Sequence, residues 1–309
     1  MIQKTTLDLI KSVRVRGMFP DASQGTLSPD NILMVASEEL KLSIIPLIMS
    51  VREKYYETFY DYAVEANKSI YDLPPRASGS IASLVQYVRD TFISNLSPLD
   101  AADVNSSNQG SYPKGFYFEN DKVVIYPTPD TTQGTLRIRY YQRPSQLCQV
   151  SAACQITEVD YVNGVVTVTA IPDDWSSGEL IDFIGGKNPY TPYSIDQEIK
   201  VISIDDTAPT TGQSLSFDAL PYDREGNEIV RVGDWIARAG YTPLPEVMDD
   251  FFPLLVVATI SRLHDALGDD ARLASSKGEF QYLSQTLVKM LTPRDQWGHK
   301  IVRSNWRNW

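Results

Sequence analysis

The sequence predicts an α+β protein in which a helical bundle, formed by the N- and C-terminal segments, carries an inserted antiparallel β domain and an extended C-terminal tail. Three observations predict this class. Apolar residues recur at helical spacing near both ends of the 309-residue chain, and the middle consists of short strand-like runs separated by Gly, Pro and Asp. The last residues show no apolar period. We therefore expect segments 1–56 and 245–291 to pack together as the bundle.

The N-terminal segment is predicted to contain two helices. The apolar residues from Leu7 to Val13 indicate a short opening helix that ends near Gly17. A second helix is expected to begin at Ser28, a favourable N-cap, with Pro29 in the first helical position. Its apolar residues cover more than one stripe, so we expect contacts on several sides. Pro46 lacks an N–H group and should bend this helix.

Segment 57–144 is predicted to form strands and loops joined to the bundle. Breaks fall at Asn67-Lys68 and at Pro74-Pro75, and the polar stretch 95–110 is expected to be a loop. The alternation between residues 115 and 141 predicts a three-stranded antiparallel meander with one solvent-exposed face.

Segment 145–244 is predicted to be an acidic β insertion, folded as a small sandwich or barrel. Short strand-like runs follow one another, with Gly, Pro and Asp between them: VNGVVTVTAI, GELIDFIGG, IKVISI, QSLSFDAL and EIVRVGDWIARAG. From Ser145 to Trp235 the chain has 4 Lys or Arg and 15 Asp or Glu, a balance of −11 that equals the net charge of the whole chain.

Helical spacing returns at Pro245, where a wide apolar face predicts a helix that ends at Gly268. A second helix should begin at Asp269 or Asp270 and run through Leu291. The remaining segment, 292–309, is the predicted tail.

The sequence shows no signal for a membrane span or a leader peptide, because no apolar run approaches about 18 residues. We expect a protein that stays in the cell or in a particle assembled there. Its two cysteines, Cys148 and Cys154, are too few for a disulfide framework. We favour two reduced thiols, although a pair between them remains open.

Catalytic and metal-binding motifs are not found in the sequence. The only histidines are His264 and His299, and neither HxxxH nor CxxC spacing occurs, so we expect no metal site and no cofactor. His264 beside Asp265 is interpreted as a surface or helix-end pair.

Two acidic pairs, Asp173-Asp174 and Asp205-Asp206, could supply glycosidase carboxylates or bind Ca²⁺. Both pairs fall in predicted turns, where Asp is common, so solvated turns are the favoured interpretation.

Three arginines, Arg137, Arg139 and Arg143, lie with Tyr141 on the predicted exposed strand face. This mixture is compatible with nucleic-acid stacking. However, a pI near 4.7 opposes phosphate binding, and we favour a charged face paired across strands.

The chain end differs from the rest of the protein, because Lys300 to Trp309 is basic and aromatic and contains no acid. Disordered ends are usually poor in tryptophan, and Trp and Arg are common anchors of protein interfaces. We favour a tail that docks on another protein over one that packs on its own surface.

Five segments, taken in order, carry a family resemblance: LSPDNILMVASEELKLSIIPLIMSVREKYY, YDLPPRASGSIASLVQYV, GFYFENDKVVIYPTPDTTQGTLRIRYYQRPSQL, VGDWIARAGYTPLPEV and LTPRDQWGHKIV. Their order resembles the head-to-tail adaptor (connector) proteins of tailed bacteriophages. The resemblance implies a virion structural protein, not an enzyme, that forms a twelve-subunit ring beneath the portal. The ring would extend the DNA channel without sequence-specific binding and offer its far side to tail or nozzle proteins.

In that family the C-terminal extension reaches into the portal protein. Carried over to this chain, the portal-docking residues would be Arg294, Lys300, Ile301, Arg303, Trp306, Arg307 and Trp309. The implied location is the head-tail junction of the virion, with assembly in the host cytoplasm. We also hypothesise that the acidic segment lines or rims the channel, where it would repel DNA phosphates. Two alternatives stay open: a carbohydrate-binding β module of a tail fibre or spike, and a glycoside hydrolase built on the acidic pairs.

Overall fold

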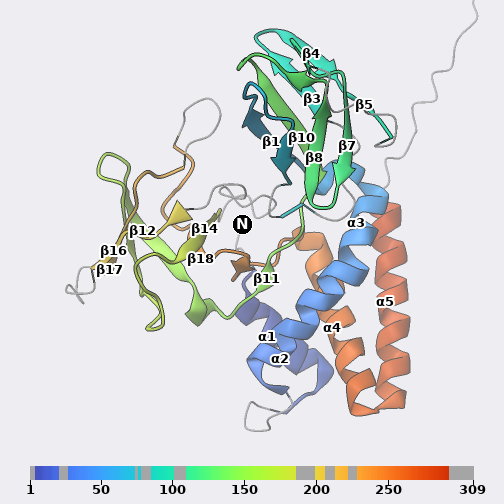
Figure 1. Ribbon diagram of the computed structural model, residues 1–309. Coiled ribbons are helices and arrows are strands. Elements are labelled where there is room, and N and C mark those ends of the chain that lie inside the picture. Colours follow the sequence, from blue (N-terminus) through green and yellow to red (C-terminus); the bar gives the residue numbers. More distant parts are fainter. Residues whose placement is uncertain are drawn as a thin grey trace, which may run out of the picture.

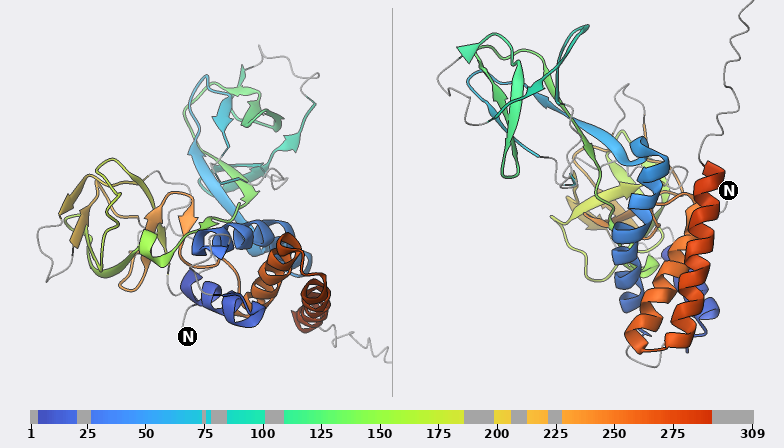
Figure 2. Two further views of the ribbon diagram at one scale, coloured as in Figure 1. Left: turned by 90° about the horizontal axis from the view of Figure 1, so that it is seen from below. Right: turned by 90° about the vertical axis from the view of Figure 1, so that its right-hand side faces the viewer.

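The computed structural model shows three lobes around a central junction (Figure 1). One lobe is helical and is built from both ends of the chain. The first β lobe holds the strands between residues 57 and 141, and the second β lobe holds those between residues 154 and 238. Views from two other directions show the same three lobes (Figure 2). The described residues are 4–20, 27–73, 76–77, 85–100, 109–185, 199–205, 213–221 and 228–291.

The predicted mixed α+β class with antiparallel strands is confirmed. The tail predicted for residues 292–309 lies outside the described residues. None of the helices within the described ranges is long and apolar enough to cross a membrane.

Both predicted N-terminal helices are present, and each begins at a capping side chain. α1 (Thr6–Gly17) starts with a capping box, in which Thr5 Oγ1 accepts from Asp8 N at 3.3 Å and Thr5 N donates to Asp8 Oδ2 at 3.0 Å. α2 (Pro29–Glu39) begins after Ser28, whose hydroxyl accepts from Asn31 N at 3.2 Å.

The long second helix changes its winding where Pro46 was expected to bend it. α2 continues into a π-helical turn, η2 (Leu40–Ile44), then into α3 (Ile45–Val51) and a 3₁₀ turn, η3 (Glu53–Tyr56). The nitrogen of Pro46 cannot donate a hydrogen bond, and the wider turn directly before it accommodates that missing bond.

The C-terminal helices form an antiparallel pair. α4 (Phe252–Leu267) follows a 3₁₀ turn, η6 (Asp249–Phe251), and ends at Gly268, whose φ is 70°. α5 (Asp270–Leu291) begins after Asp269, whose Oδ1 accepts from Arg272 N at 3.2 Å.

The predicted helix start at Pro245 is wrong, since α4 begins only at Phe252. The residues between them are held outside the helix by long-range contacts. Tyr56 Oη donates to the backbone carbonyl of Glu246 at 2.8 Å, and the Glu246 carboxylate accepts from Ser145.

One hydrophobic core is shared by α1, α2, α3 and α4. Its fully buried side chains include Leu9, Leu33 and Leu255, which come from distant parts of the sequence. α5 lies against this core through half-buried residues such as Phe280 and Leu287. Burial of one such side chain contributes roughly 1.5–3 kcal/mol, so this core is a large stabilising contact between the two ends of the chain.

The first β lobe consists of two four-stranded sheets. In one, the order is β1 (Glu57–Ala63), β10 (Thr135–Tyr141), β3 (Val85–Arg89) and β4 (Phe92–Asn95). In the other, it is β2 (Ile70–Asp72), β8 (Lys122–Tyr126), β7 (Gly115–Glu119) and β5 (Ser97–Pro98). A small parallel pair, β6 (Gln109–Gly110) with β9 (Thr128–Pro129), lies within residues 109–129. Side chains from both four-stranded sheets, including Tyr87, Phe116 and Ile138, share one core.

The predicted three-stranded meander is wrong in its last strand. The β7–β8 hairpin forms, with a left-handed turn at Asn120 (φ 54°), but β10 pairs with β1 and β3 in the other sheet. Pro127 and Pro129 separate β8 from β10 and cannot donate ladder hydrogen bonds, so the chain leaves the hairpin there. The alternation along β10 is as predicted, with Leu136, Ile138 and Tyr140 buried.

The second β lobe is a curled antiparallel sheet of seven strands. Its order is β15 (Ile199–Lys200), β14 (Leu180–Ile184), β18 (Trp235–Arg238), β12 (Cys154–Asp160), β13 (Val165–Val168), β17 (Gln213–Ser216) and β16 (Ser203–Asp205). The run predicted as one strand, IKVISI, is therefore two strands at opposite edges. Val201 N bonds to Glu179 O at 3.0 Å and Ile202 N to Ser216 O at 2.8 Å, so the curl brings the two edges together.

Two short strands join the second β lobe to the helices. β11 (Gln146–Leu147) and β19 (Tyr241–Thr242) pair in parallel, at the points where the chain enters and leaves that lobe. A 3₁₀ turn, η5 (Val150–Ala152), follows β11. Leu147 N donates to Ser37 Oγ of α2 at 3.0 Å, which attaches this connection to the helical lobe.

Candidate functional site

A buried polar site lies where the three lobes meet. We call it the junction cluster and define it by Tyr56, Arg76, Ser145, Asp182 and Glu246. Arg76 comes from the segment between β2 and β3, Asp182 from the middle of β14, and Glu246 from the chain that leads to α4. Arg76, Ser145, Asp182 and Glu246 are all less than 9% exposed, so the site is closed to solvent.

A single guanidinium nitrogen connects two sides of this cluster. Arg76 Nη2 donates to Ser145 Oγ at 2.6 Å and to Asp182 Oδ2 at 2.9 Å. The same Asp182 oxygen also accepts from the backbone N–H of Gly240 at 2.8 Å. Asp182 therefore holds both a side chain of the first β lobe and the backbone beside β19.

Ser145 is also hydrogen-bonded to Glu246. Its backbone N–H donates to Glu246 Oε2 at 3.0 Å, and its hydroxyl donates to Glu246 Oε1 at 2.5 Å. The Ser145 oxygen thus accepts from Arg76 and donates to a carboxylate, which makes a continuous chain from Arg76 to Glu246. Charge-assisted hydrogen bonds of this kind are about twice as strong as neutral ones.

The cluster holds two carboxyl groups and one guanidinium. Burial raises the pKa of Glu246, and Arg76 and Ser145 oppose that shift while the charge of Asp182 adds to it. Burial also raises the pKa of Asp182, against the opposing effects of Arg76 and the Gly240 N–H. Both carboxyl groups therefore bind a proton more readily here than in water.

This cluster is not predicted from the sequence, because its residues are isolated from one another along the chain. One signal was available. Asp182 is a charged residue inside the apolar run GELIDFIGG, and a charge at a buried strand position requires a partner. The partner, Arg76, lies 106 residues away and could not be identified from spacing.

The predicted portal-docking residues all lie in the tail, outside the described residues. These are Arg294, Lys300, Ile301, Arg303, Trp306, Arg307 and Trp309.

Three of the four paired acids, Asp173, Asp174 and Asp205, lie in the described residues. Asp173 is exposed in a turn, and Asp174 pairs with Arg238 at 2.9 Å. Asp205 ends β16, whereas Asp206 lies outside the described ranges. In the part of the chain that the structure describes, no group of three metal-ligating side chains is found.

The arginines of β10 are paired with acids across the sheet. Arg137 donates to both carboxylate oxygens of Asp61 at 2.8 Å, and Arg139 lies 3.2 Å from a Glu57 oxygen. Both guanidinium groups also lie over the ring of Phe59. Arg137 and Arg139 therefore form the charged cross-strand face that we favoured, each matched by an acid, whereas Arg143 lies beyond the end of β10 with an exposed side chain.

His264 was interpreted as a surface or helix-end pair with Asp265, and the surface part of that interpretation is wrong. His264 is only 3% exposed and its ring lies 4.8 Å from that of Phe19. Burial lowers the pKa of His264. Asp265 instead lies near Arg262, at 3.7 Å.

The two cysteines are unpaired, as favoured. Burial raises the pKa of both the Cys148 and the Cys154 thiol to about 12. Neither thiol is therefore a thiolate near neutral pH, and neither has the character of a reactive cysteine.

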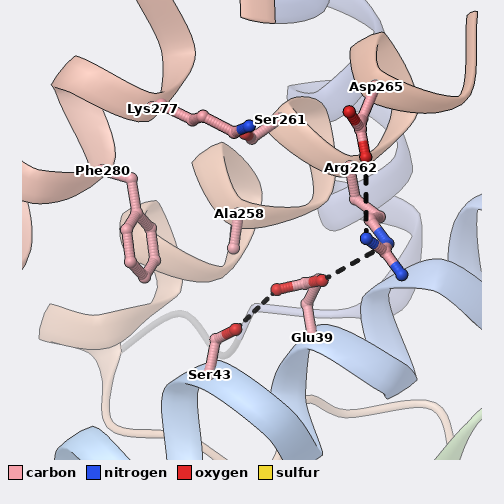
Figure 3. Close-up of a pocket in the computed structure, with 8 residues that line it drawn as sticks. All are labelled: Glu39, Ser43, Ala258, Ser261, Arg262, Asp265, Lys277 and Phe280. Carbon is pink, nitrogen blue, oxygen red and sulfur yellow. Dashed lines mark hydrogen bonds and ion pairs between the residues drawn. The ribbon is translucent and has the colours of Figure 1, made fainter. Parts of the chain in front are cut away.

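A surface pocket of about 240 Å³ lies between α2, α4 and α5 (Figure 3). Three of its charged groups, Glu39, Arg262 and Asp265, face one another. Ser43 Oγ donates to Glu39 at 2.7 Å, and Arg262 lies between Glu39 and Asp265 at 3.9 and 3.7 Å. The pocket is lined by Glu39, Ser43, Ala258, Ser261, Arg262, Asp265, Lys277 and Phe280.

The fold and the junction cluster define a three-lobed α+β protein in which a buried polar site joins parts of the same chain. The profile of the SU10 adaptor protein family matches residues 7–184, more than half of the chain. The chain therefore belongs to the SU10 adaptor protein family, a family of phage head-to-tail adaptors, and the resemblance predicted from the order of its segments is confirmed. The match runs from α1 to the end of β14 and includes Arg76, Ser145 and Asp182. A comparison with curated proteins found no match.

Proposed function

We propose that this protein is a structural adaptor in the neck of a tailed phage virion, where copies of it form a twelve-subunit ring below the portal protein. The ring extends the DNA channel and provides the surface to which tail or nozzle proteins attach. The observation that carries this proposal is the family match over residues 7–184. The chain is then a virion component of the head-tail junction, assembled in the host cytoplasm, and not an enzyme.

The division of the chain is part of this proposal. Segments 1–56 and 245–291 form the helical bundle, 57–144 the strands joined to it, 145–244 the acidic β insertion, and 292–309 the docking tail. Separate hydrophobic cores in the three lobes support this division. Such an arrangement suits an adaptor, because one body can contact the portal while another contacts the tail.

The charge distribution is compatible with a channel through which DNA slides. The arginines of β10 are paired with acids, so they do not offer unopposed cations to phosphate. The acidic excess of segment 145–235 would repel the duplex if it lines or rims the channel. A structure of the assembled ring with these acids on the outer wall would refute that placement.

We propose that the tail binds the portal protein. Its tryptophans would fill pockets and its arginines would form forked hydrogen bonds, while Lys300 would contribute at the rim. A ring repeats this contact in every subunit, so strong attachment needs only a modest contact per copy.

Deletion of residues 298–309 tests the docking role. The truncated protein should stay folded and soluble, because the described helices end at Leu291, but it should no longer bind portal protein. Binding is measured by co-sedimentation with portal rings, and electron microscopy of the mixture shows whether a ring forms below the portal.

A matched comparison identifies the dominant contacts. Trp306→Ala combined with Trp309→Ala should weaken portal binding more than Lys300→Ala, because buried aromatic anchors contribute more than rim charges. Unchanged binding after the deletion would contradict the docking role, and equal losses from both substitutions would contradict the role of the tryptophans.

A further inference from the structure

The three lobes have separate hydrophobic cores. The helical core contains residues such as Leu33 and Leu255, the core of the first β lobe contains Tyr87, and that of the second contains Phe183 and Leu215. A change in the angle between lobes would leave each of these cores closed. The relative orientation of the lobes therefore depends on the contacts at the junction.

The connection between the helices and the second β lobe consists of two linking strands and a small apolar cluster beside them, which includes Ile184, Trp235 and Leu244. The chain crosses it twice, along β11 and β19, and these strands share a short parallel pairing. Gln146 N donates to Gly240 O at 2.8 Å and Cys148 N to Thr242 O at 2.9 Å. A ribbon of two short strands holds its ends together, but by itself it resists bending and twisting only weakly.

Arg76 supplies a contact from outside this ribbon. It belongs to the first β lobe and reaches Asp182 in the second, while its bond to Ser145 reaches the base of β11. Its own backbone is held in place, since Arg76 O accepts from Arg143 N at 2.7 Å and Ala77 pairs with Gln142. Because the Arg76–Asp182 contact lies away from the two linking strands, it restricts rotation of the second β lobe about those strands.

The Arg76–Asp182 ion pair affects the relative orientation of the lobes more than it affects the free energy of unfolding. Removing two charges from water costs about as much as their attraction returns, so a buried ion pair adds little net stability. It does impose geometry, because the single nitrogen Arg76 Nη2 must lie within hydrogen-bond distance of both Ser145 and Asp182. Asp182 is further fixed by the Gly240 N–H, so the pair aligns β14 with the end of the ribbon.

We propose that the Arg76–Asp182 ion pair is an orientation lock, which fixes the angle of the second β lobe relative to the helical lobe. Opening the pair frees that angle without unfolding either lobe. The lock would hold the acidic lobe in one position in the free subunit and permit another position when neighbouring molecules in an assembly bind more favourably to it. The lock acts independently of the docking of the tail.

The test measures the distance between the two lobes, which changes with the angle between them, in the full-length protein. Spin labels are attached to cysteines introduced at Val162, in the turn after β12, and at Tyr282 on α5, whose side chains are 93% and 70% exposed. Cys148 and Cys154 are replaced by alanine in all variants. Pulsed electron paramagnetic resonance then gives the distribution of distances between the second β lobe and the helical lobe.

Arg76→Met opens the lock while keeping an apolar stem of similar length, and Asp182→Asn removes the charge with little change of shape. Arg137→Met is the matched control, because Arg137 belongs to the same β lobe and forms an ion pair with Asp61 on an outer face. We expect both junction variants to broaden or shift the distance distribution and the control to leave it unchanged. Amide hydrogen exchange in α4 and β13 should remain slow in every variant.

Three results would overturn the proposal. Unchanged distributions in folded Arg76→Met and Asp182→Asn would show that the pair does not set the angle. Equal broadening in Arg137→Met would show that the effect is not specific to the junction. Loss of slow exchange in α4 or β13 would show that the pair is needed for folding rather than for orientation.

Discussion

At the scale of single residues, one arginine is shared by two buried carboxyl groups. Arg76 contacts Asp182 directly and reaches Glu246 through Ser145. With both carboxyl groups ionised, the cluster carries one uncompensated negative charge in a closed site. A proton on one of them removes that charge, which agrees with the raised pKa of both groups.

This arrangement predicts a dependence of stability on pH. Because burial raises the pKa of Glu246 above its value in the unfolded chain, folding favours the protonated form. The part of the folding free energy that comes from this pKa difference is fully present below the unfolded-state pKa of Glu246. It is lost as the pH rises through the folded-state pKa of the same group. Each unit of pKa difference corresponds to about 1.4 kcal/mol.

Glu246→Gln should reduce this dependence, because its amide does not titrate. The free energies of unfolding of the wild type and the variant are measured in urea at a series of pH values. We expect the wild type to lose stability relative to the variant as the pH rises. Loss of one Ser145 hydrogen bond adds a cost to the variant that does not vary with pH. The exposed Glu158→Gln serves as the control, and an equal pH-dependent change there would contradict the role of burial.

At the scale of helices and strands, most element ends follow local chemistry. Thr5, Ser28 and Asp269 cap helices with their side chains, and Gly268 ends α4 in the left-handed conformation. These contacts join residues three or four positions apart, and they were therefore readable from the sequence. The exception is the start of α4, where contacts with Tyr56 and Ser145 hold Glu246 outside the helix.

Substitution of two glycines by alanine compares the effect on stability at a helix end with the effect in a helix interior. Gly268, at φ +70°, and Gly278, inside α5, both have open space where a Cβ would lie. Gly268→Ala should destabilise the helical lobe by about 1 kcal/mol, because an alanine is strained in the left-handed conformation. Gly278→Ala should stabilise it by up to about 1 kcal/mol, because glycine is a poor helix former.

Urea unfolding followed by far-UV circular dichroism measures both changes. Since neither new methyl group meets a neighbour, the two effects come from the backbone alone. Shifts of the same sign in both variants would contradict this interpretation.

At the scale of the whole molecule, three lobes with separate cores meet at one polar junction (Figures 1 and 2). This organisation suits a family of adaptors, because the lobes can present different faces to different neighbours. It also predicts that damage to one core stays local.

Phe183→Ala removes a fully buried ring that lies 5.4 Å from Phe217 in the second β lobe. Such a truncation costs about 3–5 kcal/mol. We expect hydrogen exchange to accelerate in β14 and β18, while the amides of α4 stay protected. Phe251→Ala, a fully buried ring of the helical core, should produce the reverse pattern. Acceleration throughout the chain in either variant would contradict separate cores.

The sequence by itself determined the helices, most strands, the alternation along β10 and the family. These depend on residue spacing within single elements and on the order of segments. The tertiary structure alone decided that β10 leaves the β7–β8 hairpin, that the second β lobe curls until its edges meet, and that Arg76 reaches Asp182. The physical reason is distance along the chain. Arg76 and Asp182 are 106 residues apart and Tyr56 and Glu246 190, so no local period reveals that burial forces them to become partners.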